Sequence, residues 1–472
     1  MRIDEYAAYD AVALAGLIRR GEVSATQVEN AARAAIARVN PQLNALAYPL
    51  LDTALDHTAE GVLGGVPFAI KDTGPVAKDM PFCLGSRFLE GSVAPVDSYM
   101  MQRFRAAGLA TIGITTAPEL TISFSTESAR SGPTRNPWNP AVGVGGSSGG
   151  AAALVAAGAL PIAHANDGAG SIRIPAACCG LVGLKPSRGR TPVGPYMWDP
   201  IYGLAYEFVL TRTVRDAATV LDAVAGDAPG EKYAAPSRSE EWVRAIEKAP
   251  RPLRLGFTTQ AWSGVPIDGE VVQATEAAAA MLAAAGHHVE LASPLVDPAA
   301  ILQAYVPFTI SALAGVFATG TAPRSADTLE AVSLRLFEEA GQLDGFEMAR
   351  AFQAANLVAR AIGAFFETYD VLITPTLARL PAVHGHLRYN DPSHTVETWL
   401  RSIFDYGPFT APFNISGQPA ISLPLGQSQS GLPIGVQLVG RLGREDVLLQ
   451  LGRHFEQEIG WHTRRPGIFV AP

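Results

Sequence analysis

Two stretches of sequence decide the fold, Gly143-Val144-Gly145-Gly146-Ser147-Ser148-Gly149-Gly150 and Asp167-Gly168-Ala169-Gly170-Ser171-Ile172-Arg173-Ile174-Pro175. Each is a serine-bearing glycine turn that runs into a segment of helical character, residues 151–157 after the first and residues 172–180 after the second. Such turns present backbone N–H groups in a concave arrangement that suits an anion. In acyl transfer that anion is the oxygen of a tetrahedral intermediate, so a serine in the turn can act as nucleophile beside its own oxyanion hole.

Other interpretations of the first turn fit less well. A flexible Gly/Ser linker would not run straight into an Ala-rich helix in mid-chain. A nucleophile elbow must follow a strand, and the preceding residues 136–140 contain two prolines and no apolar run. A P-loop needs Lys-Ser or Lys-Thr after its glycines, and the dinucleotide-binding fingerprint needs a glycine where Ser148 stands.

Short apolar runs alternate with helical patterns on both sides of the two turns. Strands are predicted over residues 65–72, 110–114, 160–165, 181–186, 254–257, 288–291, 370–375, 419–424 and 434–439. Helices are predicted within residues 6–40 and 300–368 and over residues 49–59, 97–107, 151–157, 172–180, 215–225, 268–285 and 444–459. This alternation favours an α/β fold with a mostly parallel or mixed sheet covered by helices.

No linker is long enough to divide the chain, so one domain is predicted over residues 1–472. Its expected parts are an N-terminal helical segment, a core, a less distinctive and partly helical pocket region, and C-terminal strands with a helix. In that order they span residues 1–60, 61–225, 226–370 and 371–472.

A serine nucleophile needs a base, and Lys71 is the best candidate. The nine histidines lie in no motif that we recognise. Lysine can serve if burial keeps it neutral near pH 7. Lys71 closes the apolar run that begins at Gly65, which suits that role better than the positions of Lys78, Lys185, Lys232 and Lys248. A solvated lysine at a strand end is the open alternative.

Composition excludes several classes of protein. The net charge of −8 and the pI of about 5.7 argue against a nucleic-acid partner. No secretory signal is evident at the N-terminus. The sequence also lacks an uninterrupted run of about 20 apolar residues, so no membrane partner is expected. Three cysteines fit a reducing cytoplasm. His384, His386 and His394 complete no ligand motif, so we expect no metal ion.

Taken together, these stretches resemble the amidase signature enzymes. The resemblance covers nearly the whole chain and is carried by residues 65–72, 143–150, 167–175, 180–187 and 414–424. It implies a single large α/β domain with a central mixed, twisted sheet covered by helices on both faces. It also implies a triad of Ser171 as nucleophile, Ser147 as a bridging serine after a cis peptide, and Lys71 as base.

The resemblance assigns further residues. Backbone N–H groups of Gly168, Ala169, Gly170 and Ser171 would form the oxyanion hole. Ser148 and Asp167 fit the supporting hydrogen-bond shell, and no metal or organic cofactor is implied. The residues themselves, without the resemblance, predict an ion pair between Asp167 and Arg173 that fixes the geometry of the second turn, which they flank. Leu120, Thr121 and Ser123, with the helical region 301–316, are the expected walls of the substrate pocket.

One departure from the family pattern concerns substrate. Ala169 stands where a glycine is usual, which leaves the N–H in place but restricts φ. This variant resembles the branch of nylon-oligomer hydrolases that act on the 6-aminohexanoate cyclic dimer, so linear or cyclic aliphatic amides, aryl amides and urethanes (carbamates) are candidate substrates. An amidotransferase A-type subunit and a non-catalytic scaffold are the competing functions. The sequence does not decide between a monomer and a homodimer.

Overall fold

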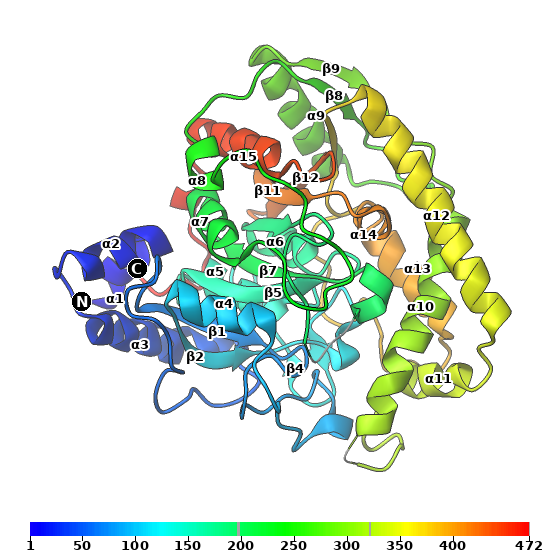
Figure 1. Cartoon of the computed structure of the whole chain (residues 1–472), viewed down its shortest axis with the longest axis horizontal. Helices are drawn as coiled ribbons and strands as arrows, with labels where there is room; N and C mark the ends of the chain where they lie inside the picture. The colour runs from blue at the N-terminus through cyan, green and yellow to red at the C-terminus, as the bar shows by residue number, and fades with distance from the viewer. Residues whose placement is uncertain (196–198, 321, 472) are drawn as a thin grey trace.

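The structure is a computed structural model, and it describes residues 1–195, 199–320 and 322–471. A large sheet runs through the middle of the molecule, with helices on both of its faces and the N-terminal helices at one side (Figure 1). The fold class predicted from the sequence is confirmed. One continuous hydrophobic core includes residues from the first helix to Val470.

The N-terminal segment is helical as far as Leu43. It consists of α1 (Ile3–Ala8), α2 (Ala11–Arg19) and α3 (Ala25–Leu43). Ser24 caps α3 with the predicted capping box, because its hydroxyl accepts from Gln27 N at 3.1 Å and the Gln27 side chain accepts from Ser24 N at 2.9 Å. The helix predicted over residues 49–59 is wrong. This segment instead runs beside the strand β2 (Leu109–Thr115), where Leu51 N donates to Ile112 O at 3.0 Å.

Two of the predicted strands form a sheet of their own. β1 (Val66–Lys71) and β2 (Leu109–Thr115) pair in parallel, and every residue of both is buried. The helix α4 (Tyr99–Ala107) precedes β2. Burial on both faces explains why the two strands are continuous apolar runs instead of alternating ones. The last residue of β1 is Lys71, so the strand delivers its amine to the interior of the protein.

The main sheet has eight strands in the order β5-β7-β6-β11-β12-β10-β8-β9. It is mixed, because β10 pairs in parallel with β8 and antiparallel with β12. The strand β7, which we did not predict, lies between β5 and β6. The bounds are β5 (Ile162–Asp167), β6 (Val182–Lys185), β7 (Tyr206–Thr211), β8 (Arg254–Phe257), β9 (His288–Leu291), β10 (Val371–Pro375), β11 (Ala420–Gln427) and β12 (Pro433–Gly440).

Helices pack on both faces of this sheet. Gly183 and Gly435 leave room for α6 (Arg173–Cys179), since a Cβ at either position would lie about 2.5 Å from an alanine of that helix. On the opposite face α7 (Val214–Val224) and α15 (Glu445–Ile459) lie together, and Gly452 of α15 packs on Leu423. α5 (Gly149–Ala156) and α9 (Gly269–Ala284) also pack on strands, and α8 (Trp242–Ala245) packs on α7 and α15.

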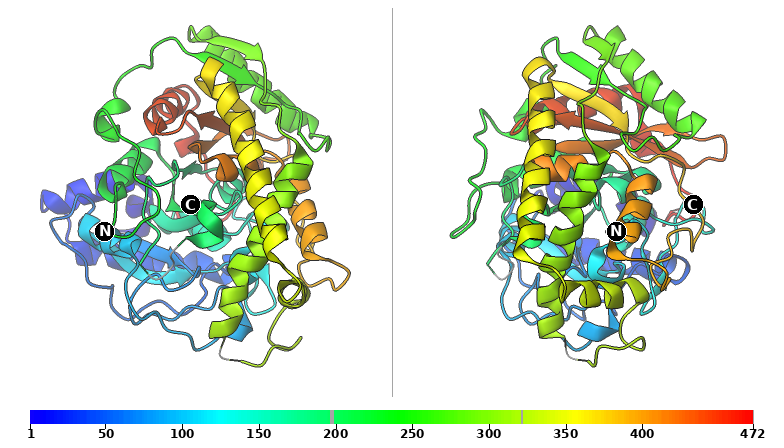
Figure 2. Two further views of the ribbon diagram at one scale, coloured as in Figure 1. Left: turned by 45° about the vertical axis from the view of Figure 1, so that its right-hand side comes forward. Right: turned by 90° about the vertical axis from the view of Figure 1, so that its right-hand side faces the viewer.

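A third layer of helices stands beside the sheet (Figure 2), and Tyr305 of this layer donates to Gly168 O of the second glycine turn at 2.9 Å. Its helices are α10 (Pro298–Thr319), α11 (Ala331–Ala340), α12 (Gly345–Thr368), α13 (Val396–Tyr406) and α14 (Ala411–Ser416). The long helices α10 and α12 lie side by side in both views. Among the described helices, only α10 is long and apolar enough to cross a membrane by composition, and half of that stretch is buried, as in the core helix of a globular domain.

Candidate active site

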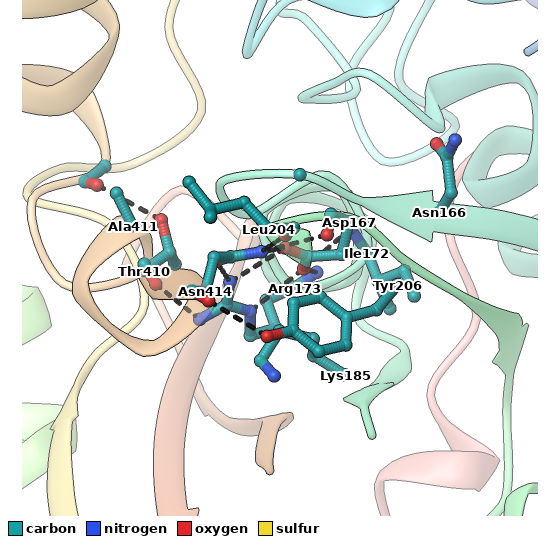
Figure 3. Close-up of polar contacts among 12 residues, drawn as sticks. Asn166, Asp167, Ile172, Arg173, Lys185, Leu204, Tyr206, Thr410, Ala411 and Asn414 are labelled. Atoms are coloured by element: carbon teal, nitrogen blue, oxygen red, sulfur yellow. Dashed lines mark hydrogen bonds and ion pairs between the residues drawn. The ribbon is translucent and has the colours of Figure 1, made fainter. Parts of the chain in front are cut away.

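The strand β5 divides the site residues between its two faces. Successive side chains of a strand point to opposite faces, so His164 and Asn166 face the same way and Asp167 faces the other way. Figure 3 shows Asn166 directed away from the cluster that surrounds Asp167. Asn166, on one face, therefore contacts the Lys71 amine, whereas Asp167, on the other face, contacts the turn that carries Ser171.

Lys71 is buried, with 1% of its surface exposed. Its Nζ lies 2.7 Å from Ser147 Oγ and also donates to Asn166 Oδ1. Burial lowers the pKa of Lys71 to about 7, although Glu207, Asp167 and Asp72 oppose this by favouring the charged amine. The solvated lysine that the sequence left open is thereby ruled out. At neutral pH a substantial fraction of this amine is uncharged and able to accept a proton.

Ser147 lies in a turn that only glycine can build. The Gly146–Ser147 peptide is cis, as the resemblance implies. A Cβ at Gly146 would lie 2.7 Å from Ser123 O, and Gly145 has a φ of +74° with the backbone of Pro175 close by. These contacts hold the hydroxyl of Ser147 against the Lys71 amine. Ser148, the predicted supporting residue, donates to Asn166 O at 3.2 Å.

The second turn places Ser171 at the start of α6. Asp167 Oδ2 accepts from Ile172 N at 3.2 Å and from Arg173 N at 3.4 Å, so the carboxylate occupies the N-terminus of that helix. Gly170 has a φ of +151°, which favours glycine, and a Cβ there would lie 2.6 Å from Thr410 Oγ1. Ala169 is not among the described non-glycine residues with positive φ, so its methyl group introduces no backbone strain.

A buried ion pair fixes this turn. Asp167 and Arg173 are both fully buried, and Arg173 Nη2 lies 2.8 Å from Asp167 Oδ1 (Figure 3). Arg173 also donates to Thr410 O at 2.9 Å and Gln437 Oε1 at 2.8 Å, and Asn414 Nδ2 donates to Asp167 at 2.9 Å. The nearby Arg173 holds the pKa of Asp167 below its usual value against the effect of burial. This is the structural role that the sequence predicts for the pair.

Replacing Arg173 by Met is expected to destabilise the protein by about 3–5 kcal/mol, because it leaves the Asp167 carboxylate buried without its partner. The matched control is Arg401→Met, since Arg401 pairs with Glu397 on the surface at 2.9 Å and both side chains are more than half exposed. That change is expected to cost about 0–1 kcal/mol. Urea denaturation of the two variants measures both values. Equal losses in the two variants would contradict the assignment.

Ser147 and Ser171 open onto one cavity of about 500 Å³. The walls predicted from the sequence, Leu120, Thr121 and Ser123, all line it, as do Tyr305 and further residues of α10. Asn166, Gly168 and Ala169 line the cavity beside Ser171. The two serines, the second glycine turn and the expected walls are therefore brought together, although they lie far apart in the sequence.

Sequence reasoning missed much of the cavity wall. Most of the missed residues are apolar and come from loops, from two short 3-10 helices (Arg87–Leu89 and Pro200–Gly203) and from α13, namely Phe82, Leu84, Leu89, Val93, Ile201, Tyr202, Leu400 and Ile403. Asp72 fixes one of these loops, because its carboxylate accepts from Leu84 N at 3.0 Å and Gly85 N at 2.9 Å. The sequence signal that could have located this loop is the acidic residue that directly follows the buried lysine.

The described residues include no group of three or more His, Cys, Asp or Glu side chains arranged to hold a metal ion. His384, the first of the three histidines considered above, lies 3.1 Å from Glu127, which raises the pKa of that histidine. The polar side chains that line the cavity carry hydroxyls, an amide and the Asp199 carboxylate, and the Lys71 amine contacts one of these hydroxyls, that of Ser147.

Two serine hydroxyls line one cavity, and the buried amine of Lys71 lies 2.7 Å from one of them, an arrangement suited to acyl transfer. The family model described as Amidase matches residues 27–449. The chain therefore belongs to the amidase family, as the sequence resemblance predicts.

Relatives with known activity lie close to this chain. It is 39% identical to the 6-aminohexanoate-cyclic-dimer hydrolases of Paenarthrobacter ureafaciens and of Pseudomonas sp. strain NK87, over 97% of this chain and 96% of each enzyme. A solved structure of 6-aminohexanoate cyclic dimer hydrolase complexed with substrate is 38% identical. It superposes with a TM-score of 0.92 over 98% of this chain and 99% of the other. The protein is an amide hydrolase of this family.

Proposed function

We propose that the protein cleaves amide bonds through an acyl-enzyme on Ser171, with Ser147 as proton relay and Lys71 as base. The observation that carries this proposal is the 2.7 Å contact between Lys71 Nζ and Ser147 Oγ inside the protein, at the cavity that Ser171 also lines. A serine hydroxyl is a weak nucleophile until a base removes its proton. Neutral Lys71 accepts that proton by way of the Ser147 hydroxyl.

The bond changes balance over two half-reactions. Ser171 Oγ forms a bond to the amide carbonyl carbon, its proton passes to Ser147, and the proton of Ser147 passes to Lys71. The carbonyl oxygen gains negative charge and is held by backbone N–H groups among residues 168–171. Ser147 protonates the leaving nitrogen, the C–N bond breaks, and Lys71 returns its proton to Ser147. Water then attacks the acyl-enzyme by the same relay and releases the carboxylic acid.

The cavity wall indicates the substrate class. The described residues that line it include no Lys, Arg or His, and its acid Asp199 is already paired with Lys232 at 2.8 Å. A carboxylate buried there would lack a partner, whereas an aliphatic chain would pack on leucines and isoleucines. We therefore propose uncharged aliphatic amides, linear or cyclic, as substrates, a class that includes the 6-aminohexanoate cyclic dimer named for the relatives.

Hydrolysis of hexanamide and of adipic acid monoamide by the purified enzyme tests this proposal, since the two amides differ mainly in a terminal carboxylate. We expect kcat/KM to be roughly tenfold or more higher for the neutral amide. Aryl amides, urethanes and the 6-aminohexanoate cyclic dimer complete the panel and rank the alternatives. Equal rates for the matched pair would contradict the substrate class. Activity only with a second subunit would favour the amidotransferase alternative.

We also propose a cytoplasmic location. The three cysteines, Cys83, Cys178 and Cys179, are free and buried. Burial raises the pKa of Cys178 to about 12, so this thiol stays protonated and unreactive. Free thiols and no disulfide framework suit a reducing compartment.

A further inference from the structure

A glutamate that the proposed acyl transfer does not use lies behind the lysine. Glu207 is on β7 directly opposite Asn166 of β5, and His164 lies diagonally across from it on the same face of the sheet. Glu207 Oε2 lies 2.5 Å from His164 Nε2, and Glu207 Oε1 accepts from Asn166 Nδ2 at 3.4 Å. Its side chain is 12% exposed and that of His164 is 1% exposed.

Both neighbours of Glu207 contact Lys71. The backbone N–H of Lys71 donates to His164 Nδ1 at 3.3 Å, and Lys71 Nζ donates to Asn166 Oδ1. Because His164 Nδ1 accepts a hydrogen bond, the ring proton must be on Nε2, where it points at Glu207. One carboxylate thus orients both of the groups that contact the lysine, one at its backbone and one at its amine.

We propose that Glu207 is a positioning residue for the base, acting through His164 and Asn166 to hold the amine of Lys71 toward Ser147. This inference rests on the proposed function, in which Lys71 is the base. A neutral amine has two N–H bonds and one lone pair. Asn166 presents its carbonyl oxygen to the amine because its NH₂ group is held by Glu207 and by Thr73 Oγ1. With one N–H bound to Asn166, the lone pair is free to face the Ser147 hydroxyl.

Glu207 also affects the charge of the base. Three carboxylates act on Lys71, namely Glu207 from β7, Asp167 from β5 and Asp72 from the end of β1. Asp167 is neutralised by Arg173, and Asp72 accepts three backbone N–H groups. Burial lowers the pKa of Lys71 most, and Glu207 is the strongest of the three carboxylates that oppose it. Removing the charge of Glu207 should therefore let the amine lose its proton at lower pH.

The rate at which an alkyl fluorophosphonate labels Ser171, measured from pH 5 to 9, tests the inference. Labelling forms the Ser171 O–P bond, breaks the P–F bond and passes the serine proton to the base. In Glu207→Gln we expect the acid limb to move about one pH unit lower and the plateau rate to fall about 3–10-fold. Glu207→Asp, which keeps the charge, should retain the limb of the parent enzyme. Glu290→Gln is the matched control and should change neither, since Glu290 lies on β9 outside the cavity wall, with a side chain that is 39% exposed and pairs with Arg254 at 3.2 Å.

The possible outcomes separate failure of this inference from failure of the proposed function. A Glu207→Gln profile that superposes on that of the parent enzyme would overturn the inference, as would an equal shift in Glu207→Asp. If no Glu207 variant yields folded protein by circular dichroism, its role is to stabilise the fold and the inference also fails. Labelling of the parent enzyme that does not require Ser171 would instead contradict the proposed function, so the two failures are distinguishable.

Discussion

Replacing Ser171 by Ala is expected to abolish amide hydrolysis, with a loss of kcat of about 10⁴–10⁶-fold, because no covalent intermediate can form. The alanine keeps the backbone N–H of the turn and removes a single oxygen atom that faces the cavity. The free energy of unfolding should therefore change by less than about 1 kcal/mol. Steady-state kinetics on a neutral aliphatic amide and urea denaturation measure the two effects separately.

The matched control for this variant is Ser402→Ala. Ser402 lies on α13, and its hydroxyl donates to Thr398 O at 2.9 Å in the preceding turn of the helix. Its loss should leave kcat within about twofold of that of the parent enzyme. Normal turnover by Ser171→Ala would show that another group attacks the amide carbonyl, and the assignment of the nucleophile would then be withdrawn.

Replacing Lys71 by Ala has the second largest expected effect, a fall in kcat/KM of about 10²–10⁴-fold at pH 7. Lys71→Arg is the sharper variant. Arginine keeps a positive charge and hydrogen-bond donors at this position but does not lose its proton in proteins. If Lys71 only positions Ser147, the Lys71→Arg variant should keep part of the activity. If Lys71 is the base, this variant should lose activity as Lys71→Ala does.

Lys248→Met is the control for both Lys71 variants. Lys248 lies on the surface, where its side chain is 60% exposed and pairs with Glu240. Its replacement should leave kcat/KM unchanged. Activity of Lys71→Arg close to that of the parent enzyme would contradict the role of base and would favour a histidine or a water molecule as the proton acceptor.

The triad candidates could be predicted because each lies in a locally constrained stretch. Glycines at 145 and 146 are required by close backbone contacts, and Lys71 ends a strand that is buried on both faces. Such constraints are visible in a single sequence as glycine turns and as a charge at the end of an apolar run. The predicted fold class follows from the same alternation of strands and helices.

The rest depends on contacts between distant segments. The apolar pattern of residues 49–59 suits a helix. The segment is not helical, because its backbone forms hydrogen bonds to β2 instead. Glu207 has no sequence motif around it. It comes into contact with His164 and Asn166 only because β7 pairs with β5. The cavity wall likewise combines single residues from loops, α10 and α13, and their spacing in the sequence carries no period.

The pH dependence of kcat/KM for a neutral aliphatic amide, measured between pH 5 and 9, tests the central claim most directly. Because the base must be uncharged and the pKa of Lys71 is lowered to about 7, the rate should fall about tenfold per pH unit below pH 7 and level off above it. A rate that is flat across this range, or one that rises toward acid, would contradict a buried lysine as the base.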